Sequence, residues 1–236
     1  EISLKQAAET LSGAGRIFVC THVEPDGDAL GSLLSLGNLL EKMGKRVVLS
    51  CQDPVPENLR FLPGSADIQR PEGFFGEDFD LACSIDASDI ERTGSAARVY
   101  KACKKTLAID HHASNTRFGL LNYVDSTVAS SGNLVCRLFG EMGAAYDKED
   151  ALLLYASLST DTGNFSFGQM DEEFFLQMAA LMRAGLDISP AARRLHLIRS
   201  PLHVKLLGRA LSSLRFYRGG RLTGMRLTRK DYKETG

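Results

Sequence analysis

The residues of this chain best suited to chemistry are His22, Asp26 and Asp28, which stand close together in one short segment. Imidazole nitrogens and carboxylate oxygens are common ligands of divalent metal ions. The Pro-Asp-Gly-Asp run inside the segment is also good turn chemistry, so a structural explanation stays open for this segment alone. An EF-hand calcium loop is excluded, because the twelfth position counted from Asp26 is Gly37 and not Glu.

Groups of the same chemical kind occur later, at Asp86, in the run Asp110-His111-His112, and at Asp161. Taken singly, an aspartate at the end of a strand is usually a turn residue, and paired histidines can belong to a surface loop or a helix cap. These groups therefore matter only if the fold gathers them at one place.

Four apolar segments predict strands that could bring these groups together. They lie at residues 16–21, 45–51, 79–85 and 105–109. They alternate with helical segments at about 3–11 and 29–43, which indicates right-handed βαβ units and a parallel sheet of the α/β class. Ligands of such sheets bind outside the carboxyl ends of the strands. His22, Asp86 and His111 each stand just beyond a predicted strand, so three separate segments would deliver side chains to one edge.

The pattern after Asn122 is helical, and a hairpin is expected around Gly219-Gly220. We expect helices on both faces of the sheet in a first domain at 1–185, a helical linker at 186–213, and at 214–236 the incomplete start of a second α/β domain. His196 and His203 lie on predicted helices and are expected to be structural or solvent-facing. The predicted helices are 128–142, 148–158, 171–184, 190–198 and 201–214.

The composition is that of a soluble globular protein, with 236 residues, 44% of them hydrophobic and 24% charged. The net charge of −1 gives no strong field toward duplex DNA or a membrane surface. Five widely spaced cysteines form neither a disulfide framework nor a zinc motif, which suits a reducing, cytoplasmic location. Cys20, Cys83 and Cys136 are expected in the core. No membrane span or signal peptide is predicted.

Together the candidate ligands have the right number and charge for two metal ions. Four carboxylates carry four negative charges, which two divalent cations would balance. The pKa of a water bound to such ions falls to about 7, so a hydroxide nucleophile would exist at neutral pH. The six candidate ligands are His22, Asp26, Asp28, Asp86, His111 and Asp161.

In their order along the chain, these residues resemble the four motifs of the DHH phosphoesterase superfamily. The resemblance covers about residues 1–185, and the run from Asp110 to Asn115 is most similar to the NrnA-like branch. The matching motifs are His22-x-x-Pro25-Asp26-x-Asp28-Ala29-x-Gly31-Ser32, then Asp86, then Asp110-His111-His112, then Thr160-Asp161-Thr162-Gly163.

The resemblance implies a role for each matching residue. His22 and Asp26 would hold one Mn²⁺, with Mg²⁺ or Co²⁺ as alternatives. Asp28, His111 and Asp161 would hold the other ion, and Asp86 would bridge both. The resemblance further implies that Asp110 orients its neighbours from behind the ligands, and that His112 contacts the scissile phosphate. Asn115 is expected in a supporting or substrate-binding role.

The resemblance also implies the reaction. Members of the branch hydrolyse very short single-stranded RNA to mononucleotides, and 3′-phosphoadenosine 5′-phosphate (pAp) to AMP. A cyclic di-AMP or linear pApA phosphodiesterase is the alternative within the enzyme class, and a catalytically weak nucleotide-binding module is the alternative outside it. The Gly-Gly-Gly-His motif of the family's C-terminal substrate-binding domain is absent, and Ser126–Gly132 follows the family only loosely. Whether the protein is a homodimer stays open.

Overall fold

The computed structural model describes residues 1–235, so Gly236, the last residue of the predicted third segment, lies outside the described residues. The chain forms two compact units, and the first, Glu1–His196, holds every candidate ligand. It extends past the predicted domain end at 185 because Leu186, Ala191 and Leu195 are buried against its core. The domain boundaries expected from the sequence remain a prediction, namely 1–185, 186–213 and 214–236.

A five-stranded parallel sheet forms the centre of the first unit, which confirms the predicted α/β class. The strand order is β2-β1-β3-β4-β5. The fifth strand was not predicted, because it has only four residues and carries Asn122 in its middle. The strands are β1 (Arg16–Cys20), β2 (Arg46–Ser50), β3 (Leu81–Ile85), β4 (Thr106–Asp110) and β5 (Leu121–Val124).

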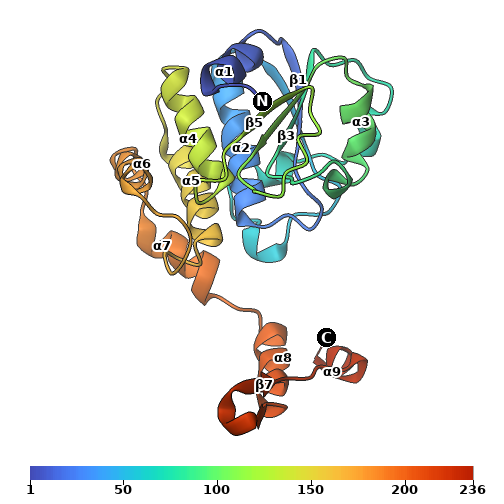
Figure 1. Ribbon diagram of the computed structural model, residues 1–236, viewed down its shortest axis with the longest axis vertical. Coiled ribbons are helices and arrows are strands. Elements are labelled where there is room, and N and C mark those ends of the chain that lie inside the picture. Colours follow the sequence, from blue (N-terminus) through green and yellow to red (C-terminus); the bar gives the residue numbers. More distant parts are fainter. Residues whose placement is uncertain (236) are drawn as a thin grey trace. The chain divides into compact units, whose positions relative to one another are not determined.

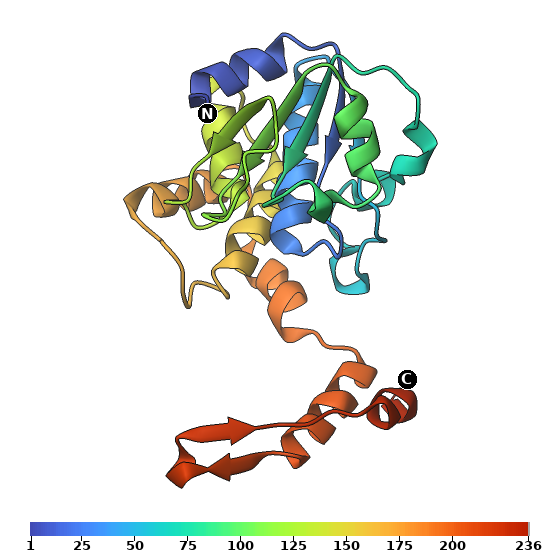
Figure 2. The same cartoon turned by 45° about the vertical axis from the view of Figure 1, so that its right-hand side comes forward.

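Helices cover both faces of this sheet (Figure 1), as the sequence predicts. On one face lie α1 (Leu4–Ser12), α2 (Gly27–Lys42), α4 (Ser131–Glu141) and α5 (Lys148–Asp161), and on the other lies α3 (Ala96–Ala102). Side chains alternate along a strand, so β1 serves both layers. Ile17 and Val19 join the core with α2, α4 and α5, whereas Phe18 and Cys20 pack with α3. Figure 2 shows α3 and its layer from a second direction.

Close contact between α2 and α5 depends on glycines. A Cβ atom on Gly31 would overlap the carbonyl oxygen of Leu153, and one on Gly27 would overlap the side chain of Thr160. Because α2 carries Asp28 and α5 ends at Asp161, this contact sets the separation of two candidate ligands. The Pro-Asp-Gly-Asp run favours a turn at Gly27, but the structure places this glycine in the first turn of α2, where it makes room for α5.

The remaining elements are mostly short. In the first unit, α6 (Glu172–Arg183) and α7 (Ile188–Ala192) follow α5. A π-helical segment, Arg193–Leu197, then interrupts the predicted helix at 190–198, and its last residue is the first of the second unit. The predicted hairpin is confirmed in the second unit as an antiparallel pair. The second unit contains α8 (Pro201–Ser212), β6 (Arg215–Tyr217), β7 (Leu222–Gly224) and α9 (Arg229–Thr235). The 3₁₀ turns are Glu57–Leu59, Ser65–Asp67, Pro71–Phe74, Glu91–Thr93 and Arg218–Gly220.

The cysteines are free thiols, and Cys20, Cys83 and Cys136 are buried as predicted. Over residues 1–235, the structure contains no helix with the length and hydropathy needed to cross a membrane.

Candidate metal centre

The loops after β1, β3 and β4 meet at the carboxyl edge of the sheet and supply half of the centre. His22 follows β1, Asp86 follows β3 directly, and His111 follows the last residue of β4. The strand order β2-β1-β3-β4-β5 reverses direction between β1 and β3, and this reversal is where parallel α/β sheets bind ligands. His22 and Asp86 therefore lie on the two sides of the switch point.

Two helices supply the other half. Asp26 is the N-cap of α2, and its carboxylate accepts a hydrogen bond from the backbone N–H of Ala29 at 3.0 Å. Asp28 lies in the first turn of the same helix. Asp161 is the last residue of α5, which runs beyond the predicted end near Leu158. All six candidate ligands thus sit at ends of regular elements, which hold their backbones firmly.

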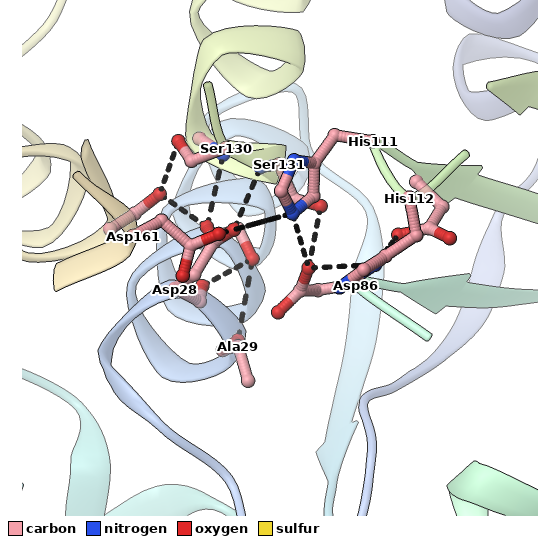
Figure 3. Close-up of polar contacts among 12 residues, drawn as sticks. Asp28, Ala29, Asp86, His111, His112, Ser130, Ser131 and Asp161 are labelled. Carbon is pink, nitrogen blue, oxygen red and sulfur yellow. Dashed lines mark hydrogen bonds and ion pairs between the residues drawn. The ribbon is translucent and has the colours of Figure 1, made fainter. Parts of the chain in front are cut away.

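The six side chains form two groups that share Asp86. In one group, Nε2 of His22 lies 3.9 Å from Oδ1 of Asp26 and 3.6 Å from Oδ2 of Asp86. In the other, Nε2 of His111 lies 3.5 Å from Oδ2 of Asp28 and 3.2 Å from Oδ2 of Asp161. Nε2 of His111 is also 3.6 Å from Oδ1 of Asp86 (Figure 3), so the two oxygens of Asp86 face different groups.

The backbone of Asp86 is held in a rare conformation. Its φ angle is 59°, in the left-handed region that non-glycine residues seldom adopt. Its N–H donates to the carbonyl oxygen of Ile109 at 3.0 Å, and its Oδ1 accepts from the hydroxyl of Ser131 at 2.9 Å. Backbone strain of this kind costs about 1–3 kcal/mol and persists only where the surroundings enforce it. Here it turns the carboxylate between the two groups.

Asp28 is fully buried and is held by the N-terminus of α4. Its Oδ2 accepts from the N–H of Ser131 at 2.8 Å, and its Oδ1 accepts from the N–H of Gly132 at 3.2 Å and from the hydroxyl of Ser157. A side chain on Gly132 would collide with the Ser157 hydroxyl. Helix N-termini stabilise anions, so this contact orients Asp28. Ser131 and Ser157 were not predicted as part of the centre, although Ser130-Ser131-Gly132 is a signal for a helix start.

The charges of the two groups shift one another's pKa values. Burial and the neighbouring charges of Asp86 and Asp161 raise the pKa of Asp28 well above its ordinary value. Partial desolvation and the charge of Asp86 likewise raise the pKa of Asp26, although 57% of its side chain is accessible. Asp86 behaves oppositely, because its contact with His22 and the charge of His111 outweigh burial and lower its pKa. Burial would lower the pKa of His111, but Asp161 and Asp86 raise it. The centre is thus an excess of carboxylates around two imidazoles.

This donor set fits divalent ions. Nε2 of His111 is buried and makes no hydrogen bond with any described residue, although it faces the carboxylates of Asp28, Asp86 and Asp161. Nδ1 of His22 lies 2.7 Å from the carbonyl oxygen of Val23, which can only accept, so Nδ1 carries a proton. Nε2 of His22 therefore remains for the centre, and it faces the carboxylates of Asp26 and Asp86. Three groups of three residues are close enough to hold a metal ion, and two of them together use all six candidate ligands. These two are His22, Asp26 and Asp86, and Asp28, His111 and Asp161; the third is Asp86, His111 and His112.

His112 has a different environment. Its Nδ1 lies 2.7 Å from Oδ1 of the buried Asp110, which raises the pKa of His112 to about 9 despite its partial burial. Nδ1 is also the nitrogen nearest to Asp86, at 3.9 Å, so Nε2 remains for other contacts. Oδ2 of Asp110 accepts from the amide of Asn115 at 2.7 Å. That amide also donates to the carbonyl oxygen of Ala87, so Asn115 is a buried support for Asp110 and is poorly placed to touch a substrate.

Of the two other histidines, His203 is exposed on α8, as expected. His196 instead contacts the buried Ser159, with Nε2 and Oγ 2.7 Å apart. Ser159 precedes Asp161 by two positions on α5, and His196 belongs to the π-helical segment. Such segments often occur at functional sites. The sequence offered no signal for this contact, because the two residues are far apart in the chain.

The parallel sheet and the clustered motif residues define a DHH-type domain. The family model "DHH family, N-terminal domain" matches residues 16–158, and the chain belongs to this family. It is 33% identical to the bifunctional oligoribonuclease and PAP phosphatase NrnA of Thermus thermophilus, over 93% of this chain and 65% of that protein. It is 29% identical to NrnA of Bacillus subtilis, over 70% of this chain and 51% of that protein. The chain thus spans between about half and two thirds of these relatives.

Solved structures agree with this assignment. An exopolyphosphatase-related protein of Bacteroides fragilis is 26% identical, with a TM-score of 0.90 over 98% of this chain and 71% of that chain. A putative family II inorganic pyrophosphatase of Methanococcus jannaschii is 16% identical, with a TM-score of 0.61 over 88% of this chain and 69% of that chain, and it supports the fold alone.

Proposed function

We propose that this protein is a two-metal phosphoesterase that hydrolyses short single-stranded oligoribonucleotides and the 3′-phosphate of pAp. The observation that carries the proposal is the position of Asp86, whose two oxygens lie 3.6 Å from His22 and 3.6 Å from His111. One carboxylate facing two separate donor groups is the arrangement that a pair of ions requires. The similarity to two NrnA proteins supports the substrate class.

In this proposal, His22 and Asp26 hold one ion, Asp28, His111 and Asp161 hold the other, and Asp86 contacts both. The ion of this proposal is Mn²⁺, with Mg²⁺ and Co²⁺ as alternatives, because four of the six ligands are carboxylates, which suit Mn²⁺. When bound, the ions supply positive charge to the phosphate oxygens and lower the pKa of water. The four carboxylates would then be neutralised, which removes the repulsion that raises the pKa of Asp28.

The remaining chemistry belongs to His112 and Asp110. His112 is half exposed, with 42% of its side chain accessible, and Asp110 favours its cationic form. Nε2 of this imidazolium would donate a hydrogen bond to an oxygen of the scissile phosphate. It can also deliver a proton to the leaving ribose oxygen, because its pKa lies close enough to neutrality for transfer. Asp110, fixed by Asn115, orients the ring.

A substrate panel tests the function. The purified protein is incubated with Mn²⁺ and pAp, RNA of two to five nucleotides, linear pApA, cyclic di-AMP or pyrophosphate. We expect AMP from pAp and mononucleotides from RNA. Preference for pApA or cyclic di-AMP would replace the proposed substrates with the alternative ones. Binding of nucleotides without turnover, with both ions present, would identify a catalytically weak binding module.

The association state and location of the protein stay predictions. A homodimer is one open possibility, which light scattering coupled to gel filtration can test. A cytoplasmic location is predicted from the free cysteines.

A further inference from the structure

Arg92 is fixed beside the first ligand group by its backbone. It lies in the 3₁₀ turn Glu91–Thr93, which follows β3 and Asp86. Its N–H donates to the carboxylate of Asp89 at 2.9 Å, and its carbonyl oxygen accepts from the N–H of Val23 at 2.7 Å. Because Val23 follows His22, the loops after β1 and β3 are joined at Arg92.

The guanidinium group of Arg92 folds toward the centre but finds no acceptor there. Its Nη2 lies 3.5 Å from Nδ1 of His22. That nitrogen already donates to the carbonyl oxygen of Val23, so it cannot accept a hydrogen bond from Arg92. Among residues 1–235, no carboxylate pairs with Arg92, whereas Arg137 pairs with Asp125 and Glu173. Arg92 thus carries an exposed, uncommitted cation.

The position of this cation is complementary to that of His112. His112 lies against Asp86 and beside His111, on the side of the second group, whereas Arg92 lies behind His22 of the first group. The imidazole of His22 stands between Arg92 and Asp86, whereas His112 contacts Asp86 from the other group. The two cations therefore flank the centre on different sides, as would suit a substrate that carries a second phosphate beside the reacting one. Guanidinium groups bind phosphates through paired hydrogen bonds, and this one is free to do so.

We propose that Arg92 binds a non-reacting phosphate of the substrate, the 5′-phosphate of pAp or the neighbouring phosphate of a short RNA. This inference rests on the proposed function. Arg92 is then a specificity residue: it favours molecules that carry a further phosphate beside the one that is hydrolysed. It contributes to binding and leaves the chemical step to other groups.

The test compares Arg92→Ala and Arg92→Lys with the unaltered protein. With pAp, Arg92→Ala should raise KM by about tenfold or more with little change in kcat, and Arg92→Lys should lie between, because a point charge replaces the planar fork. Calorimetric titration in the presence of Mn²⁺ gives a second readout, the affinity for AMP and for inorganic phosphate. AMP, which keeps the 5′-phosphate, should bind more weakly to Arg92→Ala by a similar factor, whereas inorganic phosphate should bind unchanged.

Arg98→Ala is the matched control, because Arg98 is an exposed arginine on α3 whose guanidinium lies over the ring of Phe75. It should leave KM and AMP binding unchanged. Unchanged AMP binding by Arg92→Ala overturns the proposal, as does an equal loss of inorganic phosphate binding or a loss of Mn²⁺. Failure of the unaltered protein to hydrolyse pAp and RNA refutes the proposed function instead, and AMP binding still decides the role of Arg92.

Discussion

Oδ1 of Asp110 lies 2.7 Å from Nδ1 of His112, and this pair connects the rigid sheet to the most exposed imidazole of the centre. Asp110 is the last residue of β4 and is completely buried. Because no water screens the Asp110 carboxylate, its negative charge acts strongly on the imidazole of His112. The pairing raises the pKa of His112 to about 9 and fixes which nitrogen faces outward.

His112→Ala should leave both ions bound and reduce kcat by about 10²–10⁴-fold, because a group that donates to the phosphate and leaving oxygens is lost. Metal content by plasma mass spectrometry and kcat with pAp measure the two effects. His203→Ala, which removes an exposed imidazole on α8, is the control and should change neither. Loss of an ion from His112→Ala would make His112 a ligand, since it also lies within ligand distance of Asp86 and His111.

Asp86→Asn should abolish activity and lower the Mn²⁺ content, because both donor groups lose a charged oxygen. Asparagine tolerates the left-handed backbone of this position, so the change separates charge from folding. Asp86→Ala adds backbone strain and should also lower the melting temperature. Metal content, turnover and thermal unfolding are measured for both, with the exposed Asp78→Asn as control. Two bound ions and near-normal turnover in Asp86→Asn would contradict a shared ligand.

Ser131→Ala and Ser157→Ala should each weaken Mn²⁺ binding by about 10–100-fold, because the hydroxyls hold Asp86 and Asp28 in place. Calorimetric titration with Mn²⁺ measures the change. Ser35→Ala on α2 is a matched control, since Ser35 is equally buried but its hydroxyl has no hydrogen-bond partner among the described residues. If all three variants bind Mn²⁺ alike, the serines do not orient the ligands.

Gly31→Ala and Gly140→Ala should change stability in opposite directions. A methyl group at Gly31 would press α5 away from α2, whereas one at Gly140 on α4 meets no atom within 4 Å. We expect Gly31→Ala to cost about 1–3 kcal/mol by overpacking. Gly140→Ala should gain about 0.5–1 kcal/mol, because alanine is the better helix former. Urea unfolding of both variants measures these values, and equal stabilities would contradict the close α2–α5 contact.

The sheet edge was predictable because strand ends are easily read from the sequence. β1, β3 and β4 are continuous apolar runs, and the parallel-sheet rule then places His22, Asp86 and His111 together. The DHH motifs added Asp26, Asp28 and Asp161 to this expectation, and the structure brings all six side chains into two adjoining groups.

What escaped prediction depends on contacts between distant segments. The amides of Ser131 and Gly132 reach Asp28 only because α4 begins beside α2, and Ser159 meets His196 across the fold. β5 is too short for a periodic signal, and it lies at the edge of the sheet, where it pairs with β4. The role of Gly27 was wrongly expected to be a turn, since only the packed structure reveals Thr160 above it.

The hydrogen bonds between the N-terminus of α4 and Asp28 affect how substrate binding depends on salt concentration. The N–H groups of Ser131 and Gly132 point at a carboxylate of the protein, so they are not available to a phosphate of the substrate. In the proposed function, the phosphates must instead be held by ions and by the side chains of His112 and Arg92. Attraction between exposed charges is screened by dissolved salt. The affinity for pAp should therefore fall markedly as ionic strength rises.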